Sequence, residues 1–298
     1  SDLRVEARCP HFGVCGGCKW QTFNYQSQLE AKQRQVRDNH ERLGGVDCTG
    51  MRPICGSENI YYYRNKLEFT FSTKAWRTAE EIASGELAPS HGALGFHIPQ
   101  LFDKVLNIEH CVLQADPSND IRLAVRHYAE EQGLDYYDIR NHTGFLRNLV
   151  IRNTSTGQWM VIVIVAQDDT ARLFPLLDML AERFPQITSL QYIVNTKFND
   201  SYGDLDVVTY RGMDHIEECM TGYRGSRDLH FIINPKSFYQ TNSAQAQRLY
   251  SFVAELAELQ TLRDMYYLDE LYPDYDKTVA RVFSVNSAGW FNEFYIDK

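Results

Sequence analysis

The sequence has 298 residues, of which 44% are hydrophobic and 23% charged, the composition of an ordinary soluble globular protein. Its longest apolar run, residues 160–166, has the length of a strand and is too short to span a membrane as a helix. The net charge of −9 argues against nucleic acid, but residues 1–79 carry 12 Lys and Arg against 8 Asp and Glu, so this basic part can still face phosphate.

The chain begins with a cysteine-rich segment, R-C-P-H-F-G-V-C-G-G-C-K-W, at residues 8–20. An odd total of seven cysteines and a charged start without an apolar leader argue against a disulfide framework and predict a reducing cytoplasm. The spacing C-x5-C-x2-C of Cys9, Cys15 and Cys18 predicts a metal site that needs a fourth ligand. The candidates for that ligand are a histidine or one of the other cysteines, namely Cys48, Cys55, Cys111 and Cys219.

Three interpretations of this cysteine spacing remain open. Structural zinc is the commonest use of C-x2-C, but zinc sites usually pair two such knuckles and the sequence holds no second one. An iron–sulfur cluster is the next interpretation, and it gains from Gly16 and Gly17, whose small size lets the backbone approach sulfide. Unligated thiols are the third.

The remaining pattern predicts many strands with helices between them. An exposed helix is expected at residues 24–43, ended by Gly44 and Gly45. Alternating or apolar runs predict strands at residues 66–72, 93–98, 104–108, 145–152, 159–165, 187–194, 205–210, 215–220 and 229–233. Further helices are expected at residues 116–133, 171–184 and 242–259, and an exposed loop at 76–92. This order predicts an α+β fold with a largely antiparallel sheet and flanking helices.

Two of these helices carry capping signals. Asp116 and Pro117 are expected to supply the N-cap and first-turn proline of the second helix. Asn242 is expected to cap the last one. That last helix has an apolar stripe along one face, formed by Ala246, Leu249, Val253, Leu256 and Ala257.

The cysteine segment resembles the cluster-binding loop of the RNA uracil-5 methyltransferases, S-adenosylmethionine enzymes that make 5-methyluridine in ribosomal or transfer RNA. Residues 9–21 match the pattern C-P-x-F-x-x-C-G-G-C-x-x-Q of the cluster-bearing members. Further matches follow in family order: Y-R-N-K at 63–66, G-F at 95–96, D-K-V at 103–105, I-E-H-C at 108–111 and F-x-Q-x-N at 238–242. The resemblance covers roughly residues 5–259.

The resemblance implies a set of ligands. It implies that a [4Fe-4S] cluster is bound by the four sulfurs of Cys9, Cys15, Cys18 and Cys111. Without the family, an inert buried thiol is the default interpretation of Cys111.

The resemblance also implies a place at the methyl-donor pocket. It puts Gln240 at the edge of the S-adenosylmethionine and uracil pocket, with Phe238 lining it. Without the family, Gln240 and Asn242 fit a simple helix cap. No catalytic residue is assigned, because Cys219 comes too early in the chain to be the nucleophile.

The chemistry of the family predicts an RNA partner. A thiolate adds to C6 of uracil, the enolate takes the methyl group at C5, and a base removes the C5 proton. The uracil must leave its stack to be reached. Side chains suited to contact RNA lie near the cluster loop: Lys19, Arg34, Arg37, Arg64 and Lys66 for phosphates, and Trp20, Tyr61, Tyr62 and Tyr63 for stacking. Surface cations are commonly only solvated, and tyrosines of this pattern are often core.

Several family motifs have no match. The glycine loop that binds S-adenosylmethionine, the D-P-P-R block, the nucleophilic cysteine and the catalytic glutamate are not found, and residues 259–298 resemble nothing in the family. The doubly wound methyltransferase domain is therefore expected to be absent or vestigial. The predicted division is a cluster loop and helix at 1–60, a central α+β RNA-binding domain at 61–240, and a linking helix with an atypical tail at 241–298.

Two functions of different class follow. The first is S-adenosylmethionine-dependent C5 methylation of uridine in RNA, with 23S ribosomal RNA favoured over transfer RNA and the catalytic core lying outside this chain. The second is a non-catalytic iron–sulfur module for RNA binding or assembly. Zinc-dependent structure is a more distant third. Whether this chain is itself an enzyme stays open.

Overall fold

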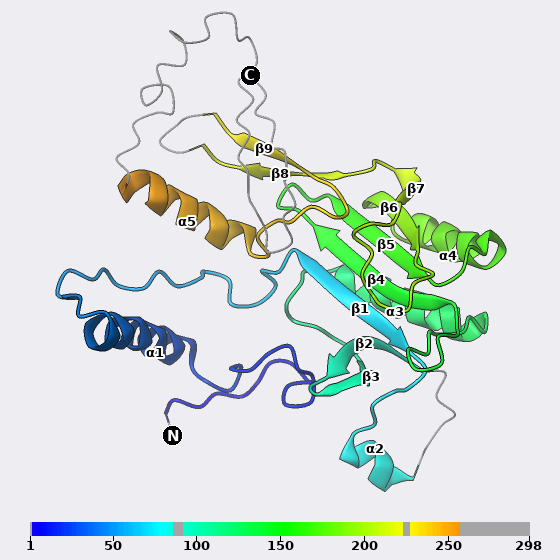
Figure 1. The fold of residues 1–298 in the computed structure, drawn as a ribbon, viewed down its shortest axis with the longest axis horizontal. Helices are drawn as coiled ribbons and strands as arrows, with labels where there is room; N and C mark the ends of the chain where they lie inside the picture. Colours follow the sequence, from blue (N-terminus) through cyan, green and yellow to red (C-terminus); the bar gives the residue numbers. More distant parts are fainter. Residues whose placement is uncertain (1, 86–91, 223–226, 257–298) are drawn as a thin grey trace, which may run out of the picture.

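A seven-stranded sheet forms the centre of the computed structural model, which describes residues 2–85, 92–222 and 227–256 (Figure 1). The strand order is β3-β2-β1-β4-β5-β6-β7, and β8 and β9 form a separate two-stranded sheet. The bounds are β1 Lys66–Ser72, β2 Ala93–Ile98, β3 Leu101–Asn107, β4 Leu146–Asn153, β5 Trp159–Val165, β6 Ile187–Val194, β7 Val208–Gly212, β8 Ile216–Met220 and β9 Leu229–Ile233.

The helices flank this sheet. Their bounds are α1 Tyr25–Asp38, continued by a π-helical turn at Asn39–Leu43, then α2 Ala79–Ser84, α3 Ser118–Glu131, α4 Thr170–Arg183 and α5 Ser243–Leu256. In Figure 1, α1 and α5 lie at the end of the molecule opposite α4 and β7.

The two central strands are buried on both faces, and this explains their composition. Every residue of β5 is buried, as are all but the last of β4. Alternate side chains point to opposite sides because a strand has a period of two. Val161 and Val163 join the core with α3 and α4, whereas Met160 and Ile162 pack toward β8, β9 and the start of α5. A strand covered on both faces is apolar throughout, which is why the run at 160–166 lacks alternation.

The predicted α+β class is confirmed, and the sheet is mixed, with antiparallel pairs predominating as predicted. All neighbouring strands pair antiparallel except β5 and β6, which are parallel. The parallel pair arises because α4 crosses over between these two strands. Hairpin order alone did not predict this crossover.

The loop predicted at residues 76–92 was wrong in part, because it contains α2. Thr78 and Glu81 form a capping box there. The Glu81 N–H donates to Thr78 Oγ1 at 3.2 Å, and the Thr78 N–H donates to the Glu81 carboxylate at 2.6 Å. This T-x-x-E signal starts a helix even in a stretch of polar composition. The strand predicted at 205–210 was also displaced, since β7 begins at Val208.

The capping predictions had different outcomes. Asn242 caps α5 as predicted, because its Oδ1 accepts the Gln245 N–H at 3.0 Å. At α3 the prediction was wrong by one position: Pro117 occupies the N-cap, and Asp116 accepts from the Asn119 side chain at 3.0 Å.

The apolar stripe of α5 is mostly exposed. Only Ala246 is buried, while Leu249 and Val253 are each 55% exposed and Leu256 is 65% exposed. Ala257 and the tail at 259–298 lie outside the described residues. Within the described residues the stripe is therefore not a core face.

No helix in the described parts of the chain combines the length and apolar character needed to cross a membrane. The division at 1–60, 61–240 and 241–298 stays a prediction.

Candidate functional site

The cysteine segment is folded into tight turns by its own backbone. The Phe12 N–H donates to the Cys9 carbonyl at 3.1 Å, and the Cys15 N–H donates to the His11 carbonyl at 2.9 Å. The Cys9 N–H in turn donates to Gln21 Oε1 at 3.0 Å. The Gly17 N–H points at Cys15 Sγ, 3.5 Å away, as an N–H that stabilises a thiolate does.

This segment is attached to a stretch about one hundred positions later in the chain. The Glu109 N–H donates to His11 Nε2 at 2.9 Å. The Tyr62 hydroxyl hydrogen bonds to His110 Nε2 at 3.2 Å, and Arg8 stacks over the Tyr62 ring at 5.0 Å. Together these contacts bring the N-terminal loop against the residues that precede Cys111.

Cys111 is buried, and two polar side chains from α3 fix its main chain and that of the residues just before it. Asn119 Oδ1 accepts the Cys111 N–H at 2.8 Å, and Asn119 Nδ2 donates to the Cys111 carbonyl at 3.2 Å. Arg122, 1% exposed, donates to Asn119 Oδ1 and to the carbonyls of Ile108 and Glu109. The segment that follows β3 and carries Cys111 is therefore held rigidly.

The four predicted ligand thiols influence one another electrostatically. Burial raises the pKa of Cys111 to about 11, and nearby Cys9 and Cys18 add to the increase while Arg122 opposes it. Burial also raises the pKa of Cys9 and of Cys15, and both are further raised by Cys18. Together with the hydrogen bond between His11 and Glu109, these effects indicate that Cys111 lies in the neighbourhood of the N-terminal thiols.

The other three cysteines have different surroundings. Cys48 is buried, with its thiol 3.7 Å from the Val46 carbonyl. The Cys55 carbonyl accepts from the Gln245 side chain on α5 at 3.0 Å. Cys219 lies on β8, and its pKa is raised chiefly by burial and further by the nearby carboxylates of Asp228 and Glu218.

The thiols do not form a closed site for a single ion. Among the described residues, no group of three or more His, Cys, Asp or Glu side chains is arranged to hold one metal ion. A four-iron cluster places different demands on its ligands, because each cysteine binds a different iron and the sulfurs surround a larger body.

The immediate surroundings of the thiols suit a larger group. A Cβ at Gly16 would lie 2.9 Å from Pro99 Cγ, so the turn is tightly packed there, whereas a Cβ at Gly17 would make only an ordinary contact with Cys15 Sγ at 3.6 Å. Gln21 Nε2 is buried and has no hydrogen-bond partner in the described part of the chain. The soft thiolate donors, the glycines and this orphan donor fit a sulfur-containing cluster.

Gln240 lies on the wall of a second candidate site, at the start of α5. Its side chain is exposed and borders a pocket of about 370 Å³ together with Cys55, Thr241, Leu249 and Phe252. Phe238 is 47% exposed and is not among the residues lining this pocket.

Two buried polar residues, which the sequence did not single out, hold the main chain around Gln240. Asn65 Nδ2 donates to the Gln240 carbonyl at 2.8 Å, and the Asn65 N–H donates to the Thr241 carbonyl at 2.9 Å. Glu218, 1% exposed, accepts the Ser243 hydroxyl at 2.9 Å and the Ser155 N–H at 3.0 Å. The only sequence signals were the Y-R-N-K match for Asn65 and the inward position of Glu218 on its strand.

The residues predicted to contact RNA fall into two groups. Lys19, Trp20, Arg34 and Arg37 are exposed. The second group is half-buried and comprises Arg64, Lys66, Tyr61, Tyr62 and Tyr63. Burial and the nearby Arg152 lower the pKa of Lys66. The first group is therefore better placed to contact RNA, because its side chains are exposed.

Comparison with known proteins identifies relatives, although no family model matches the chain. Proteins named "Uncharacterized RNA methyltransferase" from Porphyromonas gingivalis and Bacteroides thetaiotaomicron are each 50% identical to it, over 264 and 262 residues. Each match covers 87% of this chain and 56% of the relative. Over most of its length the chain is therefore similar to these RNA methyltransferases. It spans about half the length of the curated relatives it matches.

More distant matches agree with this RNA methyltransferase assignment. A Chlorobaculum tepidum relative, also named an uncharacterized RNA methyltransferase, is 35% identical over 270 residues, 88% of this chain and 54% of the relative. The fold matches Pyrococcus abyssi tRNA (uracil-54, C5)-methyltransferase in complex with S-adenosyl-L-homocysteine, with a TM-score of 0.59 and 24% identity. That match covers 86% of this chain and 52% of the solved chain, and it shows the shared fold.

These matches confirm the predicted resemblance at the level of RNA methyltransferases. They give no support to the expectation that the doubly wound domain is absent or vestigial.

Proposed function

We propose that this chain is the cluster-bearing and RNA-binding part of an S-adenosylmethionine-dependent enzyme that methylates C5 of uridine in RNA. The observation that carries the proposal is the 50% identity, over 87% of the chain, to proteins named RNA methyltransferases. The choice of uridine C5 is supported by the motifs at 9–21 and 238–242, and by the fold shared with a tRNA uracil-C5 methyltransferase.

The RNA substrate is proposed to be ribosomal rather than transfer RNA. The support is the cysteine pattern, which resembles the cluster-bearing ribosomal RNA type. The solved relative is named for a tRNA, so both RNA classes belong in the test.

The cofactor proposed for the thiol group is a [4Fe-4S] cluster held by Cys9, Cys15, Cys18 and Cys111. When bound, such a cluster supplies strong iron–thiolate bonds that cross-link the ligand-bearing segments. The chain's own contribution is to position the ligands. Asn119 fixes the Cys111 main chain, and Arg122 fixes the carbonyls of two residues just before it. His11 joins the loop to Glu109.

At the second site, the proposed contribution of the chain is to present Gln240 at the edge of the methyl-donor and uracil pocket, with Phe238 beside it. Asn65 anchors the Gln240 carbonyl, and Glu218 anchors Ser243 in the first turn of α5. These contacts leave the Gln240 side chain facing the pocket that it lines. Binding and orientation are therefore the roles assigned here, and no residue of this chain is assigned to proton or methyl transfer.

The activity is tested with the complete protein and with residues 1–298 alone. Transfer of labelled methyl from S-adenosylmethionine to undermodified ribosomal RNA and transfer RNA is measured. The complete protein is expected to methylate uridine C5, and Gln240→Ala to lower the rate. Gln132→Ala, which changes an exposed glutamine after α3, is the matched control. Residues 1–298 alone are expected to be inactive.

Two outcomes would count against this function. Binding of RNA without methylation by the complete protein would favour the non-catalytic module instead. Methyl incorporation by residues 1–298 alone would show that the chain holds a catalytic core.

The cluster is tested by iron and sulfide analysis of anaerobically purified protein. About four irons and four sulfides per chain are expected, with brown absorbance. Cys111→Ser is expected to lose most of both, while Cys55→Ser, at a half-buried cysteine beside α5, keeps them. Stoichiometric zinc without sulfide would refute the cluster and favour a structural zinc site.

A further inference from the structure

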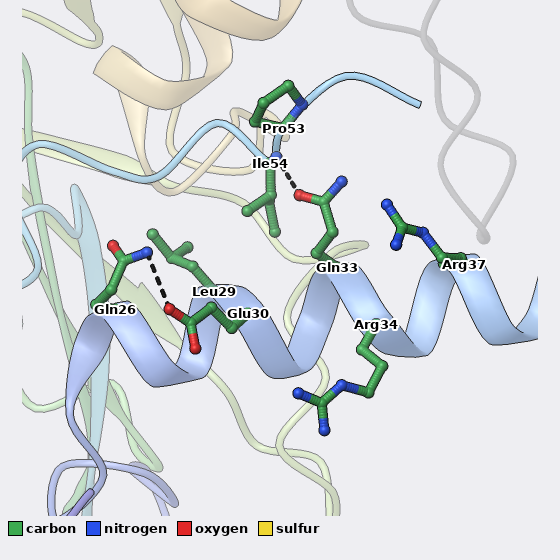
Figure 2. Close-up of a pocket in the computed structure, with 8 residues that line it drawn as sticks. All are labelled: Gln26, Leu29, Glu30, Gln33, Arg34, Arg37, Pro53 and Ile54. Atoms are coloured by element: carbon green, nitrogen blue, oxygen red, sulfur yellow. Dashed lines mark hydrogen bonds between the residues drawn. The ribbon is translucent and has the colours of Figure 1, made fainter. Parts of the chain in front are cut away.

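A groove runs between α1 and the connecting residues 52–57 (Figure 2). Gln33 closes it, because its Nε2 donates to the Arg52 carbonyl at 2.9 Å and its Oε1 accepts the Ile54 N–H. Farther along, Gly56 packs so closely on Leu29 that a Cβ there would lie 2.8 Å from the leucine Cδ1. The groove has a volume of about 340 Å³.

Apolar and cationic groups line this groove. Leu29, Pro53 and Ile54 provide apolar surface, and Arg34 and Arg37 contribute guanidinium groups. Figure 2 shows the two arginines extending from α1 in different directions.

The two arginines are exposed and available. Within the described residues, neither takes part in an ion pair or a side-chain hydrogen bond, in contrast to Arg42, which lies 3.6 Å from Asp38. The acidic group of the groove is Glu30, which accepts from Gln26 Nε2 at 3.4 Å. An anion would therefore be repelled near Glu30 and attracted toward the C-terminal half of α1.

The helix that forms one wall of the groove follows the cysteine segment closely in the chain. Gln28 Nε2 donates to the carbonyls of Phe23 at 2.7 Å and Trp20 at 3.1 Å, which ties the first turn of α1 to that segment. Trp20 itself is 48% exposed. The basic part of the chain thus carries an exposed aromatic ring before α1 and, along α1, a groove with an apolar floor and unpaired guanidinium groups. Aromatic, apolar and cationic groups are the combination that suits single-stranded nucleic acid.

We propose that this groove binds a strand of the substrate RNA, with two phosphates on Arg34 and Arg37 and a ribose or base against Leu29, Pro53 and Ile54. The inference rests on the proposed function, because that function makes RNA the partner. Each phosphate contact releases a counterion, so the groove contributes affinity that depends steeply on salt.

The test is fluorescence anisotropy of residues 1–298 with a labelled, uridine-containing single-stranded RNA of about 15 nucleotides. The titration is repeated between about 50 and 200 mM salt. For Arg34→Gln/Arg37→Gln, we expect the Kd to rise roughly tenfold, and the slope of log K against log salt to shrink by about 1.4, or 0.7 per lost phosphate contact. Circular dichroism checks that α1 is kept, since Gln is a good helix former.

The matched control is Arg183→Gln/Arg211→Gln. It removes the same charge from exposed positions on α4 and β7, at the opposite end of the molecule (Figure 1). The control is expected to leave the Kd within about a factor of two, because screened charges far from the groove contribute little.

Three outcomes would overturn the proposal, and they differ in meaning. In the first, the groove variant keeps the wild-type Kd and the wild-type slope of log K against log salt, which would show that RNA does not bind in the groove and would favour a protein as its occupant. In the second, the groove variant and the control variant lose RNA affinity equally, which would show that the effect comes from net charge and not from the groove. Failure of the wild-type chain to bind RNA would count against both the groove and the RNA-binding role proposed for this chain.

Discussion

Cys111 and Asn119 hold each other by two hydrogen bonds. The Cys111 N–H donates to Asn119 Oδ1 at 2.8 Å, and Asn119 Nδ2 returns a bond to the Cys111 carbonyl at 3.2 Å. Asn119 is 4% exposed, so neither group can exchange this partner for water. The pair attaches the proposed cluster ligand to the first turn of α3.

Replacing Asn119 by Ala is expected to lower the free energy of unfolding by about 2–3 kcal/mol, because it leaves buried main-chain groups of Cys111 unsatisfied. Urea denaturation measures this. Asn141→Ala is the control, since Asn141 is exposed and bonds only locally to Asp138, and should cost about 0.5 kcal/mol. If both variants unfold at the same urea concentration, the pair does not stabilise the fold.

Arg147 organises the loop after β6. It is 1% exposed and donates to the carbonyls of Asn195 and Asn199 and to the Asp200 carboxylate, at 2.8, 2.9 and 2.9 Å. Arg147→Met is expected to lower the free energy of unfolding by about 3–5 kcal/mol, because it leaves these acceptors without a hydrogen-bond donor. Arg183→Met, at an exposed arginine, should change little. A loss below about 1 kcal/mol for Arg147→Met would show that water replaces the guanidinium.

Asp103 predicts an acid-dependent contribution to stability. A hydrogen bond from Arg140, assisted by Lys74, lowers its pKa from 3.8 to about 2. The folded state therefore keeps the carboxylate where the unfolded state protonates it, so the stabilisation is complete above pH 3.8 and is lost as the pH falls toward 2.

Asp103→Asn should accordingly lower the urea midpoint at neutral pH, and its difference from wild type should disappear on acidification. Asp206→Asn, which changes an exposed carboxylate, serves as control. A difference that stays constant down to pH 2 would attribute the effect to packing rather than to ionisation.

Gly95 is required by the close approach of β3. A Cβ at this position would lie 1.9 Å from the Leu106 carbonyl oxygen, which is backbone and cannot move aside without breaking the pairing of β2 with β3. Gly95→Ala is expected to destabilise by about 3 kcal/mol or more. Gly50→Ala, where an added Cβ meets nothing within 4 Å, should be nearly neutral in the same urea experiment. Equal midpoints for the two variants would contradict the clash.

Local patterns predicted most of the sheet, because strand residues in this chain show their burial in the sequence. The bounds of β1, β2, β5, β6 and β9 agree with the predicted runs. The parallel pairing of β5 with β6 was missed, since it depends on where α4 returns and not on any residue of either strand. The exposure of Leu249 and Val253 was missed for a similar reason: a helical stripe does not say whether another surface covers it.

The candidate site was less predictable from spacing alone. The family resemblance proposed Cys111 as the fourth thiol, and its neighbourhood with Cys9 and Cys18 depends on long-range contacts such as His11 with Glu109. Asn65, just before β1, and Glu218, within β8, were given no role, because a single polar residue has no local mark of the partners it meets after folding.

Residues 52–57 contact α1 on one side and α5 on the other. Tyr25 accepts the Ser57 N–H at 2.6 Å, while Arg248 of α5 donates to the Gly56 carbonyl at 3.1 Å and Arg52 pairs with Glu255 at 3.2 Å. This short strip is a mechanical link between two distant parts of the chain. Through these contacts, residues 52–57 join the helix that lines the proposed RNA groove to the helix whose first turn follows Gln240.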